Sequence, residues 1–79
     1  MEKQIITTNR YQVFDGYYVD VREEVAGTGE KDYWLCNKKR KIQLFMFTKK
    51  VCNQKQEEQI LADRVRDYIQ RYERMLGIA

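Results

Sequence analysis

Three residue types are missing from the 79-residue sequence: histidine, proline and serine. Without histidine, the most frequent general base and the most frequent metal ligand in proteins are both absent. Nucleophilic sites built on Ser-His-Asp or Cys-His arrangements are therefore excluded. No pair of carboxylates stands out, and a chain of this size has little room for an enclosed active-site cavity. The sequence thus predicts a non-enzymatic protein with no cofactor and no small-molecule substrate.

Cysteine is scarce, with only Cys36 and Cys52 in the chain. Two cysteines without histidine are too few for a zinc site, and we expect both to be reduced and partly buried. The N-terminal stretch lacks the apolar core of a signal peptide, and no apolar run approaches the roughly 18 residues that span a membrane. These features predict a cytoplasmic location, where disulfides are rare, and no association with membranes.

Acidic residues are missing from the middle third of the chain. Residues 33–55 contain seven Lys/Arg and no Asp/Glu. Residues 1–32 contain four Lys/Arg and seven Asp/Glu, and residues 56–79 contain four Arg and five Asp/Glu. The modest net charge of +3 therefore conceals a strongly basic segment.

The stretch VFDGYYVDV, residues 13–21, predicts a β-hairpin because an Asp-Gly pair stands between apolar runs. A two-residue turn at Asp15-Gly16 would place Arg10 on the face that carries the apolar residues of the second strand. A three-residue loop over 14–16, with a type I turn and Gly16 in a bulge, brings the apolar residues of both strands to one face. We therefore expect these pairs: Val13 with Tyr17, Tyr11 with Val19, Asn9 with Val21, and Ile5 with Val25.

A second hairpin follows a glycine-containing loop, AGTGEK at 26–31, which matches no phosphate-binding motif. Its strands, DYWLCN and KIQLFMFTKK, are joined by a predicted turn around Lys38-Lys39. We expect the face toward the helix to pair Leu35 with Ile42 and Tyr33 with Leu44, and to include Met46. The opposite face would carry Trp34, Cys36, Gln43, Phe45 and Phe47. Because both faces are largely apolar, the outer one needs a cover or is adhesive.

The last third of the chain predicts one helix over about 54–76. Asn53 suits its N-cap with Gln56 at the third helical position, Glu57 and Glu58 suit its positive end, and Gly77 suits the position after its end. The apolar positions form one stripe: Leu61, Val65, Tyr68, Ile69, Tyr72, Met75 and Leu76. Charges of both signs on the remaining positions indicate a solvated face rather than a DNA-reading helix.

These elements predict an α+β fold in a single domain over residues 1–79. It would be a four-stranded antiparallel meander with the C-terminal helix packed on one face. We expect the strands at about 4–13, 17–25, 32–37 and 41–49. On the polar side of the second strand, Asp20 and Arg22 are expected to form a solvated ion pair of small energetic value.

The uncovered sheet face and the basic turn form the candidate partner-binding surface. Its expected apolar anchors are the aromatic residues Trp34, Phe45 and Phe47. Its expected charged residues are the four cations Lys38, Lys39, Arg40 and Lys41. Phe14, a large apolar residue on the first turn, is a further candidate. Because the apolar set is large and the cations are confined to one end, we favour a protein partner, including a second copy of the chain.

Single-stranded nucleic acid is the alternative partner, because rings on a sheet face can stack bases while adjacent cations bind phosphates. Taken by itself, the basic turn is interpreted first as a solubilising device that prevents edge-to-edge pairing of strands. Contact with phosphate or nucleic acid, and contact with an acidic protein surface, are its alternatives. In size and lack of catalytic residues the chain is similar to the small adaptors or inhibitors of phages and mobile elements, anti-CRISPR proteins among them. No motif supports that comparison.

Overall fold

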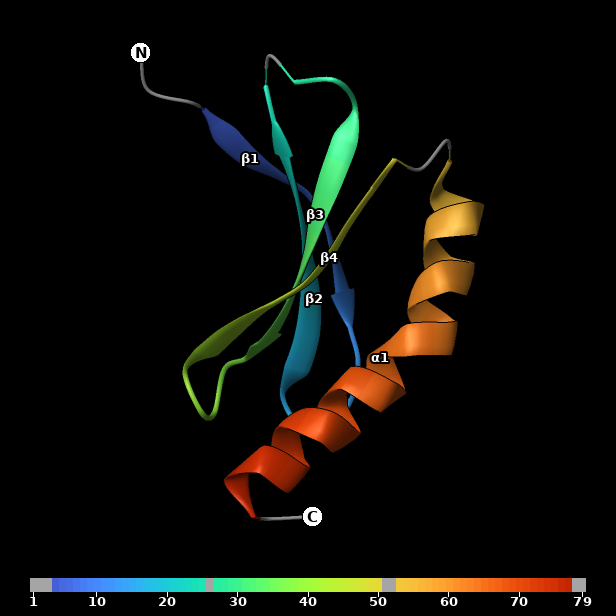
Figure 1. Cartoon of the computed structure of the whole chain (residues 1–79). Coiled ribbons are helices and arrows are strands. Elements are labelled where there is room, and N and C mark those ends of the chain that lie inside the picture. Colours follow the sequence, from blue (N-terminus) through green and yellow to red (C-terminus); the bar gives the residue numbers. More distant parts are fainter. Residues whose placement is uncertain (1–3, 26, 51–52, 78–79) are drawn as a thin grey trace.

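The computed structural model describes residues 4–25, 27–50 and 53–77, and it confirms the predicted α+β architecture (Figure 1). Four antiparallel strands form one open sheet in the order β1-β2-β3-β4. A single C-terminal helix, α1, lies along one side of this sheet. The elements are β1 (Ile5–Gln12), β2 (Tyr17–Glu24), β3 (Glu30–Asn37), β4 (Ile42–Lys50) and α1 (Gln54–Leu76).

The core lies between α1 and the sheet face that we call the inner face; the opposite sheet face is the outer face. Alternate residues of β2 and β3 point inward because successive strand side chains point to opposite faces. The buried cluster consists of Tyr17, Val19, Val21, Tyr33, Leu35, Met46, Leu61, Val65 and Ile69. Tyr11 and Val13 pack against this cluster, as the sequence predicted.

The first hairpin has the predicted register at its turn but a different turn geometry. The Val13 N–H donates to the Tyr17 carbonyl and the Tyr17 N–H donates to the Phe14 carbonyl, both at 3.0 Å. Asp15 and Gly16 have φ of 53° and 80°. Two consecutive positive φ values are typical of a type I′ turn, so the predicted type I turn is wrong. Phe14 lies between the Val13–Tyr17 pair and the two turn residues, so the strands keep the register predicted for a three-residue loop.

Strand β1 contains a bulge that the alternation of its residues did not predict. Tyr11 lies opposite Val19, as expected, but the register shifts between Thr7 and Asn9. Ile5 consequently lies opposite Glu24, and the expected pairing of Ile5 with Val25 is wrong. The Thr8 hydroxyl donates to the Val21 carbonyl at 3.3 Å within this irregular segment.

The second hairpin differs from the prediction in its turn, in its register and in the face on which Phe47 lies. The loop covers residues 38–41, so Leu35 pairs with Leu44 rather than with Ile42. The register then shifts between Tyr33 and Trp34, which makes Met46 an additional residue of β4. Tyr33 therefore lies opposite Phe47 instead of Leu44, and their rings stack at 4.8 Å between centroids. Phe47 packs against the core, and its predicted place on the outer face is wrong.

Helix α1 has the predicted caps. The Asn53 side chain accepts a hydrogen bond from the Gln56 N–H at 2.8 Å, and Gly77 adopts the left-handed conformation after the last turn. The apolar stripe is buried at its centre, but Met75 is 81% exposed at its end. Leu76 is exposed there too, so the last turn of α1 lies outside the core and the predicted burial of these two residues is wrong.

Glu57 lies in the first turn of α1, as predicted, and is buried there. Its carboxylate accepts hydrogen bonds from the Tyr11 hydroxyl at 2.5 Å and the Tyr33 hydroxyl at 2.8 Å. The Lys31 Nζ lies 3.7 Å from the same carboxylate. Burial, followed by the hydrogen bond to Glu57, raises the pKa of both tyrosines above the ordinary value. This cluster attaches the start of α1 to β1 and β3.

Candidate functional site

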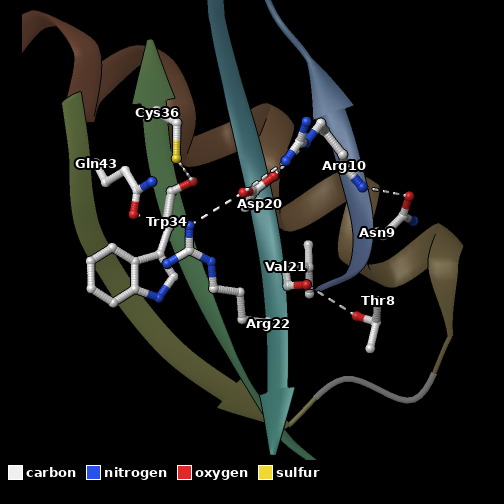
Figure 2. Close-up of polar contacts among 9 residues, drawn as sticks. All are labelled: Thr8, Asn9, Arg10, Asp20, Val21, Arg22, Trp34, Cys36 and Gln43. Carbon is white, nitrogen blue, oxygen red and sulfur yellow. Dashed lines mark hydrogen bonds and ion pairs between the residues drawn. The ribbon is translucent and has the colours of Figure 1, made fainter. Parts of the chain in front are cut away.

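A buried aspartate organises the outer face. Asp20 on β2 is only 3% exposed and accepts hydrogen bonds from the Arg10 guanidinium at 2.6 and 3.2 Å. The Arg22 guanidinium approaches the same carboxylate at 3.3 Å and also donates to Gln43 at 3.1 Å. Figure 2 shows the two arginines converging on Asp20 from β1 and from further along β2. The expected Asp20–Arg22 ion pair is therefore present, but the expectation that it is solvated is wrong.

Two aromatic rings on this face are covered by cations of the same chain. The Arg22 guanidinium carbon lies 4.9 Å from the Trp34 ring centroid, and the two side chains lie together in Figure 2. The Arg10 guanidinium carbon lies 4.6 Å from the Tyr18 ring centroid. Such cation–π contacts restrict the orientation of each guanidinium while leaving its N–H groups able to donate. Asp20 further fixes both arginines.

The predicted aromatic anchors are only partly brought together. Trp34 and Phe45 lie opposite each other on β3 and β4, with ring centroids 5.5 Å apart in an edge-to-face arrangement. Phe45 is 51% exposed. Phe47 is absent from this group because the β4 bulge turns it toward α1, where it contacts Tyr68. The candidate anchor is thus a pair, Trp34 and Phe45, which we call the aromatic pair.

The loop over Lys38–Lys41, which we call the basic loop, is held in place by Asn37. This residue is buried, and its side-chain oxygen accepts hydrogen bonds from the Lys39 and Arg40 N–H groups at 2.9 and 3.2 Å. Its side-chain nitrogen donates to the Asp15 carbonyl at 3.2 Å, so the tips of both hairpins are linked. The basic loop therefore has defined contacts with the tip of the first hairpin.

The four predicted cations point in different directions. Lys38 lies on the outer side, with its Nζ 5.7 Å from the Tyr18 ring centroid. Arg40 lies near the inner-face residue Tyr17 and donates to its hydroxyl at 3.3 Å. Lys39 contacts the first hairpin at Gly16, and Lys41 is exposed with φ of 53°. Lys38 is therefore the cation of the basic loop that is continuous with the outer face.

Phe14 does not join the outer-face aromatics. Its ring contacts Tyr17 edge-to-face at 6.3 Å between centroids. It lines an apolar groove between the end of β1 and α1, together with Val13, Leu61 and Val65. Phe14 is half exposed in this position, on the helix side of the molecule.

Four residues that link the basic loop to the aromatic pair were not among the predicted site residues: Arg10, Tyr18, Asp20 and Arg22. Alternation along the second strand did predict that Asp20 and Arg22 lie on its polar side, away from the apolar face. It could not indicate that Asp20 would be buried, because the neighbours that cover it come from other strands. The sequence signal that could have indicated this burial is the position of Asp20, in the middle of a strand that has neighbours on both sides.

In residues 4–25, 27–50 and 53–77, no group of three or more Cys, Asp or Glu side chains could hold a metal ion. Cys36 is buried on β3, and this burial raises the pKa of its thiol, which disfavours the reactive thiolate. Cys52 lies outside the described residues. No helix in the described ranges is both long and apolar enough to cross a bilayer.

Comparison with known proteins adds no assignment: no protein-family model, no curated protein and no solved structure matches the chain.

Proposed function

We propose that this chain is a non-enzymatic binding module, an adaptor or an inhibitor, that contacts another protein through its outer sheet face. The observation that carries the proposal is the aromatic pair. Within the described part of the chain, α1 covers the inner face and no element packs on the outer one. Phe45 stays half exposed there beside Trp34. Tryptophan beside a second apolar ring, with the Arg22 guanidinium over the indole, is the composition of binding hot spots.

The coverage of the rings favours a protein over single-stranded nucleic acid. Bases stack on open ring faces. Arg22 lies over the Trp34 ring, while Arg10 and Lys38 lie over the Tyr18 ring. A base would have to displace these cations, two of which are also bonded to Asp20. A protein surface can instead contact the exposed part of Phe45 and leave the cations in place.

Affinity capture with a matched control tests the proposal. The wild-type chain is compared with a Trp34→Ala/Phe45→Ala double variant and with a Met75→Ala variant, which removes an exposed apolar side chain from the end of α1. We expect a specific protein to be retained by wild type and by Met75→Ala and lost with the double variant. Equal retention by all three chains would contradict a role of the aromatic pair.

Two further measurements distinguish the other partners. If the partner is a second copy, sedimentation of the pure chain shows a dimer that Trp34→Ala dissociates. If it is nucleic acid, a labelled single-stranded oligonucleotide binds with an affinity that falls steeply as salt rises, because counterions are released. A monomer that binds no oligonucleotide at low salt leaves a different protein as the partner.

A further inference from the structure

The contacts on the outer face form one continuous series, which we call the cation–ring row. It runs from the basic loop to the edge strand β4 and consists of Lys38, Tyr18, Arg10, Asp20, Arg22, Trp34 and Phe45. Each member contacts the next through an ion pair or a ring contact. Figure 2 shows its central part, from Arg10 to Trp34. The row therefore joins the basic end of the molecule to the aromatic pair.

Positive charge dominates the exposed part of the cation–ring row. Arg10, Arg22 and Lys38 are three cations in this row, and Asp20 is its one anion. The Asp20 side chain is 4% exposed, whereas that of Arg10 is 46% exposed. Asp32 lines the same outer-face pocket as Arg10 and Arg22 and accepts a hydrogen bond from the Thr48 hydroxyl at 2.6 Å. An incoming group thus meets mainly guanidinium and ammonium groups.

The cations of the row are held in place before any partner arrives. Arg10 is fixed by Asp20 and Tyr18, and Arg22 by Asp20, Trp34 and Gln43. Asp20 uses only part of the five donors that each guanidinium carries. Ordering these side chains in advance reduces the entropy that binding must overcome. Planar guanidinium groups held this way suit carboxylates, which they can bind through two parallel hydrogen bonds.

We infer that the partner presents acidic side chains to the cation–ring row, with an apolar residue placed against Phe45. This inference rests on the proposed function and adds the chemistry of the partner. The charge complementarity lies between partner carboxylates and Arg10, Arg22 and Lys38. The order of contacts is also defined, since the carboxylates lie toward the basic loop and the apolar contact lies toward β4.

The single tryptophan of the chain, Trp34, provides the signal for a direct test. Its fluorescence is titrated at low salt with a poly-glutamate peptide of about 20 residues, and in parallel with a single-stranded oligothymidylate of about 20 nucleotides. The test variant is Arg10→Gln/Lys38→Gln. The matched control is Arg66→Gln/Arg74→Gln, which removes the same charge from exposed positions on α1. Circular dichroism melting confirms that both variants fold.

We expect poly-glutamate to change the Trp34 fluorescence. Losing two ion contacts in the test variant should weaken its binding about tenfold, whereas the control variant should lose less than about twofold. Equal weakening in both variants, or no binding to wild type, would overturn the inference. Tighter binding of the oligonucleotide, with the same dependence on Arg10 and Lys38, would overturn it in favour of phosphate groups.

The proposed function and the inference of an acidic partner can be contradicted independently of each other. If poly-glutamate does not bind but protein capture still depends on Trp34 and Phe45, the acidic partner is wrong and the proposed function stands. If poly-glutamate binds through Arg10 and Lys38 but capture does not depend on the aromatic pair, the cation–ring row binds acidic groups and the role of the aromatic pair is wrong.

Discussion

Gly16 is a single residue on which the arrangement of both hairpin tips depends. Its φ of 80° lies in the left-handed region that side chains with a Cβ disfavour. A Cβ at this position would lie 3.3 Å from the Asn37 side-chain oxygen and 3.2 Å from the Lys39 Cγ. The Asn37 oxygen cannot easily withdraw, because it accepts two hydrogen bonds within the basic loop. Glycine therefore allows the two tips to approach each other.

Gly16→Ala should destabilise the fold by about 1–2 kcal/mol, since both the backbone conformation and the tip contact are disfavoured. Gly77→Ala is the control, because Gly77 has a similar φ of 73° with open space around it. We expect the control to lose less, about 1 kcal/mol. Urea denaturation measures both values. Equal losses would show that the contact between the tips contributes nothing to stability.

The bulge at Met46 in β4 decides which aromatic side chains of this strand lie on the outer face. Met46 and Phe47 both face the core, and the Tyr68 hydroxyl donates to the Met46 carbonyl at 3.2 Å. A bulge leaves one residue without a cross-strand partner, and the helix supplies a partner for that carbonyl. In regular alternation Phe45 and Phe47 would share the outer face. The bulge separates them.

Phe47→Ala should cost about 2–3 kcal/mol of stability, because Phe47 stacks on Tyr33 and contacts α1. Phe45→Ala should cost less than about 1 kcal/mol, because this side chain is half exposed. Thermal or urea unfolding of the two variants provides the comparison. Similar, small losses for both residues would indicate that β4 is regular and that Phe47 lies on the outer face.

At the scale of the whole molecule, one buried carboxylate connects elements that are distant in sequence. Glu57 on α1 accepts hydrogen bonds from Tyr11 on β1 and Tyr33 on β3. Both hydroxyls must keep their protons to donate. Their raised pKa means that the folded state binds these protons more tightly than the unfolded state does. This contribution to stability is complete below about pH 10, the ordinary tyrosine pKa, and is lost as the pH rises beyond it.

We therefore predict alkaline destabilisation that depends on these tyrosines. At pH 7, Tyr33→Phe should lower the free energy of unfolding by about 1–3 kcal/mol, because one oxygen of buried Glu57 loses the hydrogen bond from Tyr33. Above about pH 10, wild type should lose stability more steeply than Tyr33→Phe, so that the difference between them shrinks. Urea unfolding at pH 7, 9 and 11 measures this, with Tyr72→Phe as the control. A constant difference across the range would contradict the coupling.

Short-range patterns correctly predicted the elements and much of their facing. The alternation in β2, the Asn53 cap and the Gly77 end each depend on a few neighbouring residues, and the structure confirms them. The register around Tyr11 and Val19 could also be predicted, because only one pairing places the apolar residues together. These features use local geometry or the simple separation of apolar from polar surface.

By itself, then, the sequence determined the order of the elements, the inner-face residues of β2 and β3, and the location of positive charge at one loop. The tertiary structure decided the rest: the bulges near Thr8 and at Met46, the burial of Asp20 and Glu57, and the removal of Phe47 from the outer face. The physical reason is common to all of these features. A bulge or a buried charge is unfavourable locally and persists only where distant residues, such as Arg10 for Asp20 or Tyr68 for Met46, complete its hydrogen bonds.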